Sequence, residues 1–165
     1  MLLLRAAIFT LFIPGSVTVL VPYALLHSDL ECAVGIPLVL RVLGLLPLAA
    51  GMAVYLWCAW EFSVAGRGTP APYDPPRMLV TGGLYAFVRN PIYVAIVSII
   101  FGEALLFGSI AVFGYGVLLL ALLHLRLLLY EEPRLRRKFG ASYDDYYHSV
   151  PRWLPRTTRR ATPPP

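Results

Sequence analysis

Apolar and polar positions alternate in long blocks along the chain. Four stretches are almost free of charged residues, at about residues 5–26, 36–60, 92–107 and 110–130. A helix of about 20 consecutive apolar residues can cross a bilayer. The pattern therefore predicts an all-α, polytopic membrane protein with about four transmembrane helices. The third stretch is the shortest, since a helix of that length spans only about 24 Å against a hydrocarbon core of ~30 Å.

The first stretch has a competing interpretation as a secretory signal peptide, because it lies near the start of the sequence. Its apolar run is longer than the hydrophobic region of a signal peptide. Pro22 and Tyr23 are followed by no small-residue cleavage site. We therefore expect a retained span.

The second stretch is typical of a helix that reaches both membrane interfaces. Arg41 lies near one end and can extend its charge to the interface, while Trp57 and Trp60 mark the other end. Gly44 and Gly51 would let a neighbouring helix approach closely.

The third and fourth stretches are separated only by Gly108 and Ser109. So short a connection predicts a helical hairpin in which these two helices pack antiparallel. A ligand site near this hairpin is then built from both helices.

The segment from residue 131 to residue 155 has a different pattern. Its apolar residues recur every three or four positions, which is the spacing of one helix face, at Leu135, Phe139, Tyr143, Tyr146 and Val150. We expect an interfacial amphipathic helix, broken or bent near Gly140, that roofs a pocket between the third and fourth spans. Residues 156–165 are expected to be disordered.

The composition agrees with a membrane protein. Apolar residues make up 58% of the chain and charged residues only 14%, whereas about a quarter of a soluble domain is charged. Four spans leave too little chain for a soluble domain, so residues 1–165 are predicted to form a single domain. Cys32 and Cys58 form no CxxC pair, so we expect no zinc site, no disulfide framework and no other metal.

The positive charges predict the orientation. The net charge is +5, and most cations lie beyond residue 130. The first loop, residues 27–35, has two carboxylates and no lysine or arginine, whereas the second loop contains Arg67, Arg77 and Arg89. The positive-inside rule places the N-terminus, the second loop and the tail in the cytosol. Because the basic tail directly follows a span, we expect it to bind anionic membrane lipids and not nucleic acid.

Two polar clusters lie on the predicted cytosolic side. Arg89-Asn90-Pro91 opens the third span, with Asn90 suited to the N-cap and Pro91 to the first helical turn. Glu131-Glu132 closes the fourth span. Taken alone, the first cluster fits an ordinary capped helix start as well as it fits a ligand site. The second cluster also fits an ordinary solvated helix end.

Both clusters belong to longer motifs. The run Gly83-Leu-Tyr85-Ala-Phe-Val-Arg89-Asn-Pro91-Ile-Tyr93 resembles the GxYxxxRHPxY signature of the isoprenylcysteine carboxyl methyltransferase and phospholipid methyltransferase superfamily. The segment from Glu131 to Pro155 resembles the second signature of that superfamily, EExxLxxxFGxxYxxYxxxVPxxIP. The resemblance implies a helical membrane enzyme that uses S-adenosylmethionine in a cytosol-facing pocket, with S-adenosylhomocysteine as the product. It also implies a lipophilic acceptor drawn from the bilayer.

The resemblance further implies which residues contact the cofactor. These positions lie in the two motifs and in the loop before them: Arg77, Met78, Leu79, Val80, Tyr85, Arg89, Asn90, Pro91, Ile92, Tyr93, Glu131, Glu132 and Tyr143. Their apolar side chains and tyrosine rings suit an adenine ring, and a carboxylate can accept hydrogen bonds from ribose hydroxyls or an ammonium group.

The chain departs from the family pattern at two positions. Asn90 replaces the usual histidine; it keeps a donor and an acceptor but does not titrate. The family arginine one turn before the first glutamate aligns with Leu127, whereas this chain has Arg126, about 100° round a helix. Arg126 and Glu103, a carboxylate inside the third span, are the candidate catalytic residues. Alternatively, Glu103 has a structural role and pairs with Arg126 or His124. We expect His124 to be a hydrogen-bonded structural group.

The predicted function is methyl transfer to a lipophilic small molecule or lipidated acceptor, as in isoprenylcysteine carboxyl methyltransferases. The first alternative is a phospholipid or small-amphiphile amine or thiol methyltransferase on the same scaffold. The second is a non-catalytic membrane scaffold. The sequence leaves the acceptor and the oligomeric state open.

Overall fold

The regular structure of the chain is helical in every part that the computed structural model describes, which is residues 12–30, 33–64 and 79–155. In chain order the elements are η1 (Ser16–Leu20), α2 (Val21–Leu26), α3 (Leu38–Leu43), α4 (Leu45–Val64), η2 (Gly83–Ala86), α5 (Pro91–Phe107), α6 (Ile110–Arg126), η3 (Leu127–Glu131), α7 (Glu132–Phe139) and α8 (Ala141–Ser149). The all-α prediction is confirmed for these ranges. The start of the first predicted span and the expected disordered end, residues 156–165, lie outside them.

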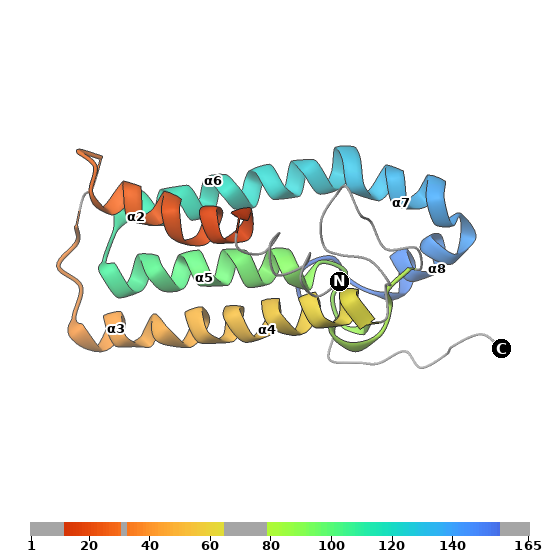
Figure 1. The fold of residues 1–165 in the computed structure, drawn as a ribbon, viewed down its shortest axis with the longest axis horizontal. Coiled ribbons are helices and arrows are strands. Elements are labelled where there is room, and N and C mark those ends of the chain that lie inside the picture. Colours follow the sequence, from red (N-terminus) through yellow and green to blue (C-terminus); the bar gives the residue numbers. More distant parts are fainter. Residues whose placement is uncertain (1–11, 31–32, 65–78, 156–165) are drawn as a thin grey trace.

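Helix α5 forms the centre of the bundle. It lies between α3–α4 on one side and α6 on the other, and α2 lies beside α6 (Figure 1). Its buried side chains include Ala95, Ile96, Val97, Ile99 and Ile100. The short helix is thus enclosed by its longer neighbours.

Among the described residues, two helices are long and apolar enough to cross a membrane, Leu38–Glu61 and Ile110–Phe139. Shorter apolar helices cover Ser16–Leu26 and Pro91–Phe107. Many large apolar side chains on the two long helices are exposed, among them Leu56, Trp57, Leu118 and Leu122. Apolar surface on this scale is typical of a face that contacts lipid.

Glycine allows α5 to pack unusually close to α3 and α4. A Cβ atom added at Gly44 would lie 2.6 Å from the carbonyl oxygen of Gly102, and one added at Gly51 would lie 2.7 Å from that of Ala95. The close contact predicted for Gly44 and Gly51 is therefore confirmed. Gly102 is the partner on α5, which sequence reasoning missed.

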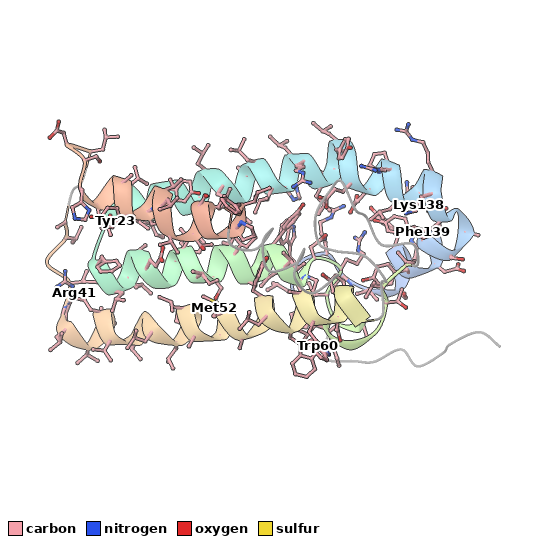
Figure 2. The ribbon with its side chains drawn as sticks, viewed as in Figure 1. Tyr23, Arg41, Met52, Trp60, Lys138 and Phe139 are labelled. Carbon is pink, nitrogen blue, oxygen red and sulfur yellow. The ribbon has the colours of Figure 1, made fainter. Side chains whose placement is uncertain are left out.

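The connection between α5 and α6 is capped on both sides. Gly108 ends α5 in the left-handed region, with φ 66°, and Ser109 Oγ accepts a hydrogen bond of 3.1 Å from the backbone N–H of Val112. Arg41 donates from Nη2 to the carbonyl of Phe107 at 2.8 Å. Arg41 therefore caps the C-terminus of α5, and its expected position at a membrane interface stays a prediction. Figure 2 shows Arg41 and Trp60 at opposite ends of the α3–α4 helix.

The segment after η3 forms two helices, α7 and α8. Helix α7 continues in the direction of α6, and α8 folds back from its end (Figure 1). The chain reverses at Gly140, whose backbone has φ 55° and ψ −131°. The predicted break or bend at Gly140 is confirmed, and the expected position of this segment at a membrane interface stays a prediction. Glycine tolerates this positive φ, so the apolar stripe is divided between two helices that face each other.

Gly102 gives a test of the close packing. A Cβ atom at this position would lie 2.7 Å from the backbone nitrogen of Leu48 and 2.8 Å from the carbonyl oxygen of Gly44. Because both neighbours are backbone atoms, we expect Gly102→Ala to destabilise the fold by about 1–3 kcal/mol. Gly114 in α6 has no atom within 4 Å of an added Cβ, so Gly114→Ala is the control. Thermal unfolding in detergent micelles should show a lowered midpoint for the first variant only.

Candidate functional site

A cavity of about 330 Å³ lies at the end of the bundle where α5 begins and where η3, α7 and α8 meet. Its polar lining residues include Arg89, Asn90, Tyr93, Arg126 and Glu131. The apolar lining extends along the helices through Val17, Ile96, Leu119 and Leu123 and reaches Ile13, Pro14 and Tyr55. The cavity therefore joins a charged end to an apolar end, and its size suits a small ligand.

Glu131 is the centre of the charged end. The hydroxyl of Tyr93 donates a hydrogen bond to Glu131 Oε1, and Arg126 Nη2 lies 3.1 Å from the same oxygen. The side chains of Arg126 and Glu131 are 44% and 25% exposed. A carboxylate and a guanidinium thus both face the cavity and remain accessible to a ligand.

Glu132, the next residue, is buried in a separate ion-pair network. Its Oε1 lies 3.0 Å from Arg89 Nη1 and 3.0 Å from Arg152 Nε, and its Oε2 accepts from Arg152 Nη2 at 3.0 Å. The backbone N–H of Arg89 donates to the carbonyl of Pro151 at 2.9 Å, and its guanidinium lies 4.0 Å from the ring centroid of Tyr147. The network therefore fastens the tail after α8 to the start of α5.

Aromatic residues of α8 close the end of the cavity next to η2. The hydroxyl of Tyr146 donates to the backbone carbonyl of Tyr85 at 2.8 Å. Burial raises the pKa of Tyr85 and of Tyr146 well above the ordinary tyrosine value, so both hydroxyls stay protonated. Burial also raises the pKa of Tyr143. Phe139 lies where α7 turns into α8 (Figure 2), and it lines the cavity with Tyr143 and Tyr146, as the predicted roof requires.

The loop before α5 is positioned by Gly83 and Glu61. Gly83 begins η2 with φ 55°, and an added Cβ would lie 1.4 Å from Glu61 Oε1. The indole N–H of Trp57 donates to that oxygen at 2.9 Å. A side chain at residue 83 would therefore displace the carboxylate that packs against this turn.

Most of the predicted cofactor positions that the structure describes line the cavity. These are Leu79, Val80, Tyr85, Arg89, Asn90, Ile92, Tyr93, Glu131 and Tyr143. Pro91 is buried at the first turn of α5, and Glu132 belongs to the ion-pair network behind the cavity. Arg77 and Met78 lie outside the described residues. Asn90 is the N-cap residue of α5, but its side chain makes no capping hydrogen bond, which corrects the expected cap.

The two candidate catalytic residues are separated. Arg126 lines the cavity, whereas Glu103 is not among the described residues that line it. Helices α5 and α6 run in opposite directions from Gly108, so Glu103 is close to the turn and Arg126 is far from it. Arg126 pairs instead with Glu131, and His124 Nδ1 accepts a hydrogen bond of 3.3 Å from Trp153 Nε1. The alternative in which Glu103 pairs with Arg126 or His124 is therefore wrong. The expectation that His124 is hydrogen-bonded is confirmed.

Sequence reasoning missed the apolar wall. Tyr55 comes from α4, and Leu119 and Leu123 come from α6. The spacing of four and three residues through Leu119, Leu123 and Arg126 marks one helix face, but leucines occur all round this helix and hide the signal. In the described part of the chain, no group of three or more histidine, cysteine, aspartate or glutamate side chains could hold a metal ion.

The comparison with protein-family models matches residues 39–142 to the model described as phospholipid methyltransferase. The matched range covers more than half of the chain and extends from α3 into α8. The comparisons with curated proteins and with solved structures gave no match. The family match confirms the resemblance that the two motifs indicated.

The ion-pair network predicts that Glu132 stabilises the fold. The side chains of Glu132 and Arg89 are each only 9% exposed, so Glu132→Gln leaves the buried Arg89 and the partly buried Arg152 without a full counter-charge. We expect a loss of about 3 kcal/mol in the free energy of unfolding, because removing one partner of a buried pair is strongly destabilising. Asp144→Asn breaks the Arg136–Asp144 pair, whose side chains are 48% and 52% exposed, and should cost less than about 1 kcal/mol. Equal unfolding curves for the two variants would contradict this role.

Proposed function

The chain belongs to the phospholipid methyltransferase family, and on that basis we propose that it transfers a methyl group from S-adenosylmethionine to a lipophilic acceptor. The observation that supports this most directly is the cavity of about 330 Å³, which joins the charged cluster at Glu131 to an apolar wall on α5 and α6. A charged cofactor and a lipophilic acceptor need these two environments next to each other.

The charged end of the cavity fits the cofactor. Arg89 Nε is buried and has no hydrogen-bond partner among the described residues, so it is available to an acceptor group such as a carboxylate. Glu131 offers a carboxylate to an ammonium group or to ribose hydroxyls. Leu79, Val80 and Tyr85 supply apolar and aromatic surface for the adenine ring.

The residues of the cavity have to align the reactants and exclude water. When bound, S-adenosylmethionine supplies an activated methyl group, which passes to a lone pair of the acceptor as the sulfur–carbon bond breaks and its electrons return to sulfur. Leu119 and Leu123 hold the apolar part of the acceptor against α6. Phe139, Tyr143 and Tyr146 cover the opposite end, where they keep water from the reacting groups.

The proposed topology has four spans, with the cavity on the cytosolic side. The Leu38–Glu61 and Ile110–Phe139 helices are long enough to cross a bilayer, and α5 and the helix that includes Ser16–Leu26 complete the set. The α5–α6 pair then forms a membrane hairpin. The tail from residue 131 onward carries most of the chain's arginines, which suits anionic lipid headgroups at the cytosolic surface.

A panel of acceptors separates the candidate activities. Prenyl-cysteine, phospholipid-amine and thiol acceptors are incubated with the detergent-solubilised protein and S-adenosylmethionine labelled on the methyl group. We expect the labelled methyl group to be transferred to one lipophilic class of acceptor. Binding of S-adenosylhomocysteine without transfer to any member of the panel would favour a non-catalytic scaffold.

The orientation predicts labelling from opposite faces. In a variant with Cys32→Ala and Cys58→Ala, single cysteines are placed at Asp29, in the first loop, and at Asp145, which is exposed on α8. An impermeant thiol reagent should label Asp29→Cys from outside intact cells and Asp145→Cys only after the membrane is opened. Labelling of both from the same side would contradict the proposed topology.

Glu131 provides the test of cofactor binding. A charge-assisted hydrogen bond contributes about 1.5–3 kcal/mol, which corresponds to roughly ten- to a hundredfold in affinity. We therefore expect Glu131→Gln to weaken S-adenosylhomocysteine binding by about that factor, measured by titration calorimetry in detergent. Asp145→Asn removes an exposed carboxylate of α8 and should bind like the parent. Near-parental affinity of Glu131→Gln would show that the carboxylate does not contact the cofactor.

A further inference from the structure

A π-helical turn interrupts the long helix at the cavity. The turn η3 covers Leu127–Glu131, between α6 and α7, and the backbone N–H of Glu132 bonds to the carbonyl of Leu127, five residues earlier. Pro133 follows directly. A proline has no N–H for the α-helical ladder, and its ring clashes with the carbonyl four residues earlier. The sequence thus disfavours a regular α-helical turn here, and such π turns occur frequently at functional sites.

The π turn decides which side chain shares a face with Glu131. In a regular α-helix, residues five apart lie about 140° apart round the axis, whereas residues four apart lie on one face. Leu127, four residues before Glu131, would therefore face the cavity. Instead Leu127 is only 2% exposed in the core, and Arg126 lies 3.1 Å from Glu131. Because the turn contains one extra residue, Arg126 lies on the cavity wall in the place that Leu127 would take in a regular α-helix.

We infer that this π turn shifts the helical register so that Arg126 lies on the cavity wall, where its guanidinium binds an anionic group of the ligand. Arg126 stands above the apolar wall formed by Leu119 and Leu123. Its Nη2 pairs with Glu131, and the guanidinium has further donors suited to a carboxylate or phosphate. The inference on ligand binding rests on the proposed function, whereas the register itself does not. The anionic group belongs either to the cofactor or to the acceptor.

Deletion of a single residue tests the register. Leu129 is 77% exposed, so its removal sacrifices little packing, and combining the deletion with Pro133→Ala permits a regular α-helix. Arg126 then stands four residues before the glutamate and keeps its place, because α6 and α7 both keep their orientation. We expect the midpoint of thermal unfolding and the affinity for S-adenosylhomocysteine to stay within about threefold of the Pro133→Ala parent.

Deletion of Leu118 is the matched control. Leu118 is 58% exposed but lies in the regular part of α6, where loss of one residue rotates the rest of the helix by about 100°. This deletion should abolish the cooperative unfolding transition. If deletion of Leu129 is as damaging as deletion of Leu118, the register inference is wrong. The unfolding comparison remains decisive even if the parent fails to bind S-adenosylhomocysteine, a result that would contradict the proposed function instead.

Substitution of Arg126 tests whether this residue binds an anionic group and whether the cofactor or the acceptor carries that group. Arg126→Leu should retain the parental unfolding midpoint. It should either lower the affinity for S-adenosylhomocysteine or raise the KM for the acceptor by about tenfold or more, and Arg126→Lys should recover part of the loss. A loss in S-adenosylhomocysteine affinity assigns the anion to the cofactor. A raised KM for the methylated member of the acceptor panel, with unchanged S-adenosylhomocysteine affinity, assigns it to the acceptor. Parental values of both quantities would overturn anion binding by Arg126.

Discussion

The buried ion pair between Arg89 and Glu132 is the interaction on which the arrangement of the site depends. It joins the segment just before α5 to the first residue of α7, and Arg152 brings the tail into the same network. Buried charges are costly unless they are fully paired, so these three segments have to meet in one arrangement. The cavity is then enclosed between them, with Glu131 directed into it by the adjacent position on the helix.

The sequence predicted the helices, the family and most of the cavity lining, because each has a local signal. Phe139, Tyr143 and Tyr146 were placed in the roof from their spacing alone, and Gly140 was identified as the bend. The sequence indicated only in part that Glu131 and Glu132 have different surroundings. Two identical neighbouring residues differ only in direction, and the buried partners of Glu132 come from distant segments at Arg89 and Arg152.

The positions that sequence reasoning missed depend on contacts between distant parts of the chain or on an irregular helix. Gly102 packs against Gly44 through a backbone approach that no local pattern records. The side of the helix that Arg126 occupies was misjudged, because a regular α-helix was assumed through residues 127–131. Leucines surround that segment and provide no periodicity, so Pro133 was the single local indication of a wider turn.

The length of the helix from Ile110 to Phe139 has a consequence for which molecules can react. Its 30 residues extend about 45 Å, against ~30 Å of hydrocarbon. With Ile110 at the far boundary of the hydrocarbon, Arg126 stands at a height of about 24 Å and Glu131 at about 32 Å. In the proposed topology, this length would set the cavity at the depth where acyl chains give way to polar groups. The proposed enzyme would then select an acceptor by how far its nucleophile stands above its own hydrophobic anchor, in addition to its chemical identity.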